Sequence, residues 1–404
     1  MADSVVPPAS DPPPSRTARG TRRGFWFRLA LGLLAIGSIT AWRYTLTRPN
    51  YRYRKANEAI TQKDWDGVRW YAERLAAAGR DDLAMLALAE MELQRGEPLA
   101  AAERLARFPD TGDRAAAAVM VGRAMMGLHR PRDAGAAFRL ALELRPDSIE
   151  ARRGAAQLAY NIGQLDTAVA HLEQLLVLDA VDGKPAKLLG DIQSDLGRHD
   201  EAIAAYRESL VRELPVVVRR EAERSLANSL GKRGRFDELL ALWMDSNAAG
   251  ASNDAEWSAL RGEAYRGTGS PEDARRIVDS ALKSFPPTSR LLALRGQLEL
   301  DSGDVRAAVK SLEAAVALAP ADYPMRLALS QAYAADGRKD DADRAARKAE
   351  ELRLDLELIT KLTGEAEQKP WDAPVRRQLA DVCERMGNTA MARQWRELAD
   401  QLSR

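Results

Sequence analysis

From residue 49 to the C-terminus, one pattern recurs about ten times: a small residue is followed twelve positions later by a second small or apolar residue. The second members are 33 to 37 residues apart along most of the chain, and 50 apart at the end. A repeat of this length is typical of stacked helical hairpins. The sequence therefore predicts an all-α solenoid. The pairs are Ala56/Val68, Ala89/Ala101, Gly122/Ala134, Ala156/Ala168, Gly190/Ala202, Ala227/Leu239, Gly262/Ala274, Gly296/Ala308, Ser330/Ala342 and Ala380/Ala392.

Glycine occupies one fixed place in this pattern, five residues before the second member, in eight of the ten units. Glycine lacks a Cβ and can therefore adopt the left-handed conformation that ends a helix. Acidic residues often follow, as in Asp200-Glu201, where they oppose the positive end of the next helix dipole. Each of these places is therefore predicted to be the turn of a helical hairpin. The glycines are Gly96, Gly163, Gly197, Gly234, Gly269, Gly303, Gly337 and Gly387, and Lys63 stands in this place in the first unit.

These units resemble tetratricopeptide repeats, which carry small residues at repeat positions 8 and 20, an aromatic residue near position 24 and a proline at position 32. Residues 115–148 fit best, through Gly122, Ala134, Phe138 and Pro146. The resemblance is clear over residues 82–354 and weaker before and after them. It implies a right-handed superhelical solenoid of about ten hairpins, in which the first helix of each hairpin lines a concave groove.

The repeats are predicted to form one solenoid over residues 49–354. The longer final spacing then predicts a helical extension and linker over 355–372, with a polar break at 364–372. Residues 373–404 are predicted to form a terminal hairpin. Its last helix carries one apolar stripe, as a helix that caps a stack requires. The stripe consists of Met391, Trp395, Leu398 and Leu402.

The N-terminal segment has a different composition. Residues 1–23 are rich in proline and arginine and cannot bury a core, so they are expected to be disordered. Residues 24–46 are apolar, with Arg28 as the one charge before Trp42 and aromatic residues near both ends. A spanning helix needs roughly 20 residues, and aromatic side chains suit the headgroup regions. We expect a single transmembrane signal anchor; a cleaved signal peptide and a buried soluble helix are the alternatives.

The charges around this segment leave its orientation open, because basic residues flank both sides. A basic tail, one apolar segment near the start and a long polar body together form the layout of a signal anchor. We therefore expect a single-pass membrane protein whose repeat domain lies outside the cytoplasm.

The sequence offers no catalytic constellation. His129, His171 and His199 fall in different hairpins, without a second histidine or cysteine at metal-ligand spacing. There is no phosphate-binding loop and no nucleophile elbow. The 60 basic and 59 acidic residues nearly balance, which argues against a nucleic-acid-binding surface. We therefore expect no enzymatic activity, no cofactor, no metal and no nucleic acid; the oligomeric state stays open.

The resemblance also suggests a binding site, because it implies which side chains of the first helices face the groove. At these positions the middle of the stack carries a row of cationic and amide side chains, and such a row suits an acidic or C-terminal peptide. The alternative is that these cations are solvated surface residues. Leu260 stands where the carboxylate-clamp members of the family need an asparagine, so clamp specificity is not implied. The candidate groove residues are Arg123, Arg153, Gln157, Lys187, Arg224 and Asn228.

Together these features predict a membrane-tethered scaffold or adaptor that binds partner proteins or peptides, in envelope assembly or secretion. One alternative is an accessory repeat subunit of an envelope enzyme complex. The other is a secreted repeat protein, if the N-terminal segment is cleaved.

Overall fold

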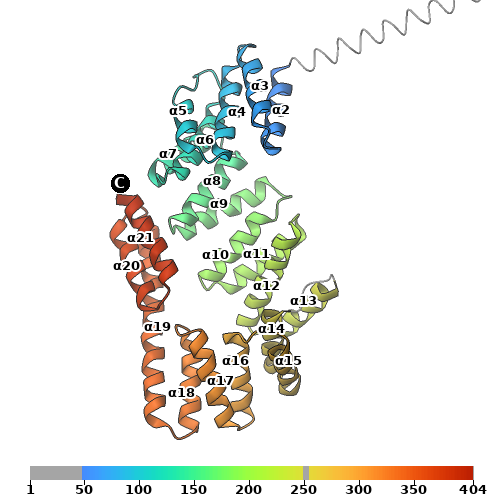
Figure 1. Ribbon diagram of the computed structural model, residues 1–404, viewed down its shortest axis with the longest axis vertical. Helices are drawn as coiled ribbons and strands as arrows, with labels where there is room; N and C mark the ends of the chain where they lie inside the picture. Colours follow the sequence, from blue (N-terminus) through green and yellow to red (C-terminus); the bar gives the residue numbers. More distant parts are fainter. Residues whose placement is uncertain (1–47, 249–253, 404) are drawn as a thin grey trace, which may run out of the picture. The chain divides into compact units, whose positions relative to one another are not determined.

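The computed structural model describes residues 48–248 and 254–403, and these residues form twenty α-helices and no strand (Figure 1). The predicted all-α class is confirmed. The chain divides into two compact units. Unit 1 holds α2 (Pro49–Thr61), α3 (Trp65–Ala76) and α4 (Asp81–Gln94), and unit 2 holds all later helices.

Within unit 1, α3 packs on both of its neighbours. Ala59, Ile60, Val68 and Met91 form one of its apolar clusters. The unit is also tied by a hydrogen bond from Arg52 Nη1 to the carbonyl of Arg74, at 2.8 Å.

Unit 2 contains α5 followed by eight helical hairpins, each made of two consecutive helices that pack on each other. Consecutive hairpins also contact one another, so the apolar clusters follow the chain from hairpin to hairpin. The helices are α5 (Pro98–Leu105), α6 (Arg114–Gly127), α7 (Pro131–Leu144), α8 (Ile149–Asn161), α9 (Leu165–Leu178), α10 (Lys184–Asp195), α11 (His199–Val211), α12 (Val216–Lys232), α13 (Phe236–Ala248), α14 (Ala255–Gly267), α15 (Pro271–Ser284), α16 (Ser289–Asp301), α17 (Val305–Leu318), α18 (Tyr323–Ala335), α19 (Lys339–Gln368), α20 (Ala373–Arg385) and α21 (Thr389–Ser403).

The recurring pairs of small residues lie in the core, and all twenty of their members are buried. Gly190 shows why the first member must be small. A Cβ added there would lie 2.5 Å from the ring of Tyr206, on the second helix of the same hairpin. The pairs thus mark where two helices approach each other too closely for larger side chains.

The hairpin turns are also as predicted. All eight glycines of the pattern have a positive φ, between 68° and 84°. The two remaining units have Lys63 (φ 58°) and His129 (φ 55°) in the same place. A left-handed residue with a Cβ is disfavoured by about 1–2 kcal/mol. The turn geometry is therefore kept even where the sequence does not supply glycine.

The end of the chain differs from the expected polar break over 364–372. Helix α19 is 30 residues long and continues to Gln368, so Lys369–Asp372 alone separate it from α20. Leu362 and Ala366 are buried in a cluster with residues of α20, and this packing keeps the last turns of α19 helical.

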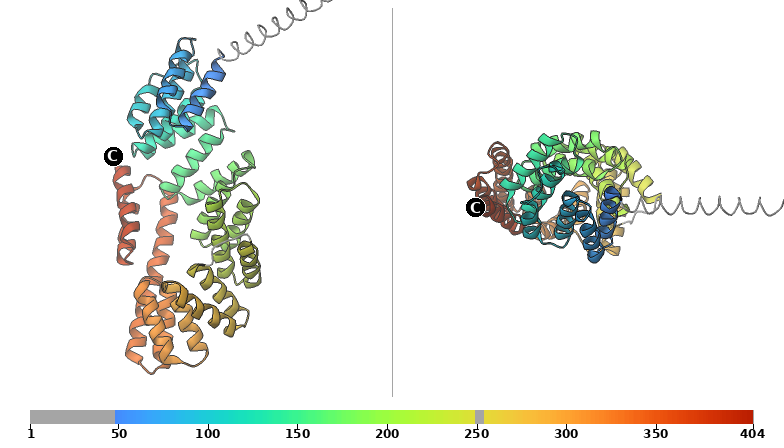
Figure 2. Two further views of the ribbon diagram at one scale, coloured as in Figure 1. Left: turned by 45° about the vertical axis from the view of Figure 1, so that its right-hand side comes forward. Right: turned by 90° about the horizontal axis from the view of Figure 1, so that it is seen from above.

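The long α19 leads to a contact between segments that are far apart in sequence. The hairpin α20–α21 and the end of α19 pack on α7, α8 and α9 (Figure 2). The predicted apolar stripe on α21 supplies part of this contact: Leu398 and Leu402 share one buried cluster with Phe138 of α7, and Trp395 packs against it. Met391 is exposed. The last helix thus covers an early hairpin of the same unit, in addition to its partner α20.

The side chains of Glu367 and Arg376 bind the C-terminal segment to the turn between α8 and α9. Glu367 accepts hydrogen bonds from the backbone N–H groups of Asp166 and Thr167, at 3.3 and 3.0 Å, and from the Thr167 hydroxyl at 2.6 Å. These donors are at the N-terminus of α9, where the N-cap residue Gln164 provides no side-chain cap. An anion is favourable at this end of a helix dipole.

Arg376 is the positively charged residue that contacts the same turn, and its side chain is fully buried. It donates to the carbonyl of Ile162 at the end of α8, at 2.9 Å. It also donates to Ala366 and Lys369 in the last turn and C-cap of α19, at 3.2 and 2.7 Å. These carbonyls lie at the negative ends of two helices. We call the contacts of Glu367 and Arg376 with the α8–α9 turn the C-terminal clasp.

The predicted tail, residues 1–23, and the predicted transmembrane segment, residues 24–46, lie outside the described residues. Within residues 48–248 and 254–403, no helix is both long enough and apolar enough to cross a bilayer.

Candidate functional site

The predicted groove residues lie on the first helices of four successive hairpins. Arg123 is on α6, and the other five lie on α8, α10 and α12, where, together with Asp191, they make three pairs. In each pair the two residues are four positions apart, so they share one face of their helix. The pairs are Arg153 and Gln157, Lys187 and Asp191, and Arg224 and Asn228. Asp191, which was not among the predicted residues, thus occupies the place of an amide in the middle pair.

The first pair is held by carboxylates from the loop before the next hairpin. Arg153 Nη2 lies 3.3 Å from Asp182 and 3.6 Å from Asp179. Backbone N–H groups of Asp182 and Val181 hold the pKa of Asp179 below its ordinary value, so this carboxylate stays charged. Gln157 donates to Asn161 on its own helix, at 2.8 Å.

The second pair forms a small network. Lys187 Nζ lies 2.7 Å from Asp191 and 3.9 Å from Glu221 of α12. Asp191 also accepts a hydrogen bond from the Tyr206 hydroxyl at 2.9 Å. Burial, together with the charge of Asp191, raises the pKa of Tyr206 above its ordinary value, so the hydroxyl remains a donor.

The third pair contacts the start of the following hairpin. Arg224 Nη2 lies 2.6 Å from Asp254, which is the N-cap of α14 and accepts from the backbone N–H of Trp257. Asn228 is half-buried. Arg123, on α6, is half-buried and has an interaction of its own.

The structure thus gives each of Arg153, Lys187 and Arg224 a carboxylate from the next hairpin or from the loop before it. The row of cations is a row of ion pairs, and the carboxylates beside it outnumber the three cations. These ion pairs hold the side chains in place but reduce the positive potential that an acidic peptide would meet. Whether this face binds a peptide stays a prediction. The carboxylates are Asp179, Asp182, Asp191, Glu221 and Asp254.

Part of this network could have been found in the sequence. Lys187 and Asp191 have the spacing of an ion pair within one helix. Arg153 and Asp182, or Arg224 and Asp254, are 29 and 30 residues apart, a little less than one repeat. Such pairs are found in the sequence only when the loop before each hairpin is compared with the first helix of the preceding hairpin.

No group of three or more histidine, cysteine, aspartate or glutamate side chains with the geometry of a metal site occurs in the described part of the chain. The single cysteine, Cys383, is buried in α20. Burial raises the pKa of its thiol, so the reactive thiolate is disfavoured.

Three stretches of the chain match the family model of the tetratricopeptide repeat. Residues 119–185 and 153–218 overlap, and residues 293–353 are separate from them. In these stretches the chain is similar to tetratricopeptide repeats. The stretches include α8 and α10, which carry two of the three groove pairs. The family resemblance seen in the sequence is therefore supported by the comparison for these stretches.

Several solved structures are similar to this chain at low identity. A tetratricopeptide repeat protein from Parabacteroides merdae is 18% identical over 61% of this chain and 97% of its own, with a TM-score of 0.39. PilF of Pseudomonas aeruginosa is 16% identical over 55% and 97%, with a TM-score of 0.40. Human IFIT1, solved as a dimer with PPP-AAAA, is 17% identical over 88% of this chain and 94% of its own, with a TM-score of 0.38. At such TM-scores these structures carry no argument about function. No curated protein matches the chain.

Proposed function

We propose that this protein is a scaffold that binds segments of partner proteins along the face defined by the pairs on α8, α10 and α12. One observation carries the proposal. The ion pairs of Arg153, Lys187 and Arg224 fix a regular row of polar side chains on a stack of tetratricopeptide repeats. Side chains that are already ordered lose less entropy when a partner binds, which favours recognition.

This arrangement suits a partner segment with both charged and amide groups better than a purely acidic one, since carboxylates lie beside each cation. Gln157 and Asn228 can exchange hydrogen bonds with the backbone of an extended segment. An acidic residue of the partner would have to displace one of these carboxylates. This exchange is possible because the ion pairs are partly exposed and individually weak.

We expect the triple variant Arg153→Gln, Lys187→Gln and Arg224→Gln to bind its partners about 10- to 100-fold more weakly, as three contacts of up to about 1 kcal/mol each are lost. Glutamine is the suitable replacement. Glutamate would face Asp182, Glu221 and Asp254, and charge repulsion would then disturb the fold. Partners are captured by cross-linking to the full chain, and the affinity of the most abundant one is then measured for each variant.

The matched control changes three exposed cations on second helices instead: Arg139→Gln on α7, Arg207→Gln on α11 and Lys310→Gln on α17. This control alters the net charge by the same amount and should bind like the unmodified chain. Equal binding by both triple variants would show that partners are recognised elsewhere.

We further propose that residues 24–46 tether this scaffold to a membrane, with the repeats outside the cytoplasm. The apolar length of this segment and its terminal aromatic residues support the proposal. The full chain should stay in the membrane fraction after carbonate washing, and a reporter that is active only outside the cytoplasm should be active when fused after Arg404. Release by carbonate would contradict the tether, and an inactive reporter would contradict the orientation.

A further inference from the structure

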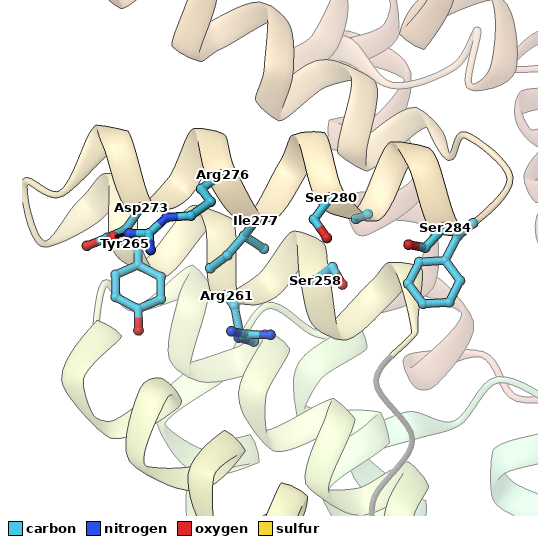
Figure 3. A pocket seen from close by; sticks show the side chains of 10 residues that line it. Ser258, Arg261, Tyr265, Asp273, Arg276, Ile277, Ser280 and Ser284 are labelled. Atoms are coloured by element: carbon cyan, nitrogen blue, oxygen red, sulfur yellow. Dashed lines mark hydrogen bonds and ion pairs between the residues drawn. The ribbon is translucent and has the colours of Figure 1, made fainter.

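A cavity of about 370 Å³ lies between the two helices of the hairpin α14–α15 (Figure 3). Helix α14 lines it with Ser258, Arg261 and Tyr265, which recur at the spacing of one helix face. The facing stripe of α15 includes Ile277, Ser280 and Ser284. The cavity thus combines hydroxyl groups and apolar carbon with two guanidinium groups, those of Arg261 and Arg276.

Arg261 is unusual for its place in the repeat. It directly precedes Gly262, the small residue of its hairpin, and seven of the ten units have an apolar residue in this place. The other two exceptions are cations with carboxylate partners: Lys55 pairs with Glu58, and Arg295 pairs with Glu299 at 2.9 Å. The seven apolar residues are Leu88, Val121, Ala155, Leu189, Leu226, Leu329 and Leu379.

Arg261 has no such partner among the described residues. Its guanidinium carbon lies 3.6 Å from the centroid of the Trp243 ring, on α13. Its Nε atom is buried and makes no hydrogen bond. Burial lowers the pKa of this side chain, but an arginine remains charged at neutral pH. A partly desolvated cation without a counter-charge destabilises the free protein, and an incoming anion would relieve this.

The nearby charges do not supply that anion. Asp273 lines the same cavity, but it is paired with Arg276. Together Arg261, Arg276 and Asp273 leave one positive charge in excess, which matches a single carboxylate. Ser280 and Ser284 are exposed on one side and can hydrogen-bond a peptide backbone, while Ile277 and Phe285 offer an apolar wall. A volume of this size suits a side chain and its neighbour rather than a folded domain.

We propose that this cavity is a second recognition site, which binds an acidic side chain of a partner segment. The carboxylate pairs with Arg261, whose guanidinium lies over the Trp243 ring, and an adjacent apolar side chain of the segment packs on Ile277. This site is on a different hairpin from the groove pairs, so it does not depend on the proposed scaffold function of that groove.

The test uses three short probe peptides and the full chain in detergent micelles, with ligand-observed saturation-transfer NMR to detect weak binding. The first is acetyl-Leu-Glu-Phe-amide. The second has glutamine in place of glutamate, and the third has glutamine with a free C-terminal carboxylate. We expect the first to bind at least tenfold more tightly than the second. Binding of the third peptide alone would overturn the assignment to a side chain, and equal binding of the first two would overturn the site.

The variant Arg261→Leu separates this role from a structural one. It restores the residue type found in most other hairpins and removes an unpaired cation, so the melting temperature should rise while binding of the first peptide is lost. The matched control is Arg295→Leu, one hairpin later, where the cation is paired; this change should leave peptide binding unaltered. Undiminished binding by Arg261→Leu would overturn the proposal.

A second variant keeps the test decisive if Arg261→Leu does not fold. Ser280→Val together with Ser284→Val narrows the cavity from the exposed side of α15, and it should weaken binding of the first peptide at least tenfold with little change in melting temperature. Unchanged binding by this double variant would also contradict the site.

Discussion

Replacing Arg376 with alanine is expected to destabilise unit 2 by about 3–5 kcal/mol. The side chain is fully buried and donates hydrogen bonds to carbonyls of α8 and α19. Each hydrogen bond to a charged group contributes about 1.5–3 kcal/mol, and the orphaned carbonyls could not all reach water. The removed side chain would also leave a cavity. Denaturant unfolding followed by circular dichroism measures the loss.

Hydrogen exchange would show where the stability is lost. In Arg376→Ala, protection should fall in α20, α21 and the α8–α9 turn, and remain high in α14–α17, which do not contact the clasp. The neighbouring Arg377→Ala is the matched control, because Arg377 is exposed and pairs with Asp400 at 3.7 Å on the surface. If both variants lose the same small amount of stability, the C-terminal clasp does not hold the hairpin in place.

Gly190→Leu is expected to cost about 3 kcal/mol, at the upper end of what overpacking does in cores. Even the Cβ of the new side chain would lie 2.5 Å from the Tyr206 ring. That ring cannot easily move aside, because its hydroxyl donates to Asp191 at 2.9 Å. Thermal unfolding of the variant should begin in α10 and α11, as hydrogen exchange of these two helices can test.

The control for this variant is Gly364→Ala in α19. This glycine is exposed within the helix, and a Cβ added there meets nothing within 4 Å. Since alanine is favoured over glycine by about 1 kcal/mol in a helix interior, this change should stabilise the protein. A melting temperature that falls in both variants would mean that close packing at Gly190 is not the cause.

The hairpins could be predicted because their signals are local. A glycine at a turn, and two small residues twelve positions apart, are read within one repeat, and Gly197 and Gly190 do in the structure what their types suggest. The left-handed backbone conformation of Lys63 and His129 is predicted by their position in the repeat, and not by their residue type. The repeat pattern thus predicts the turn at these two positions, which the individual residues do not.

The C-terminal clasp could not be predicted, because Glu367 and Arg376 are about 200 residues from the turn they contact. Nothing in the local pattern distinguishes them from exposed charges. The groove stays a prediction. Its cations lie on the helices where the repeat pattern put them, but carboxylates from neighbouring loops pair with them, and the sequence reading missed these. Arg261 was also missed, although the sequence shows that most other repeats have an apolar residue at this position.

The C-terminal clasp restricts how a protein of this kind can evolve or be engineered. An open stack of repeats can gain or lose a hairpin, since each repeat contacts only its neighbours. Here, the hairpins from α10 to α19 must together bring Glu367 and Arg376 back to one turn, between Ile162 and Thr167. An inserted or deleted hairpin would carry both side chains past that turn. Substitutions can accumulate within each repeat, whereas the number of repeats between α9 and α20 is fixed by the contact that ends them.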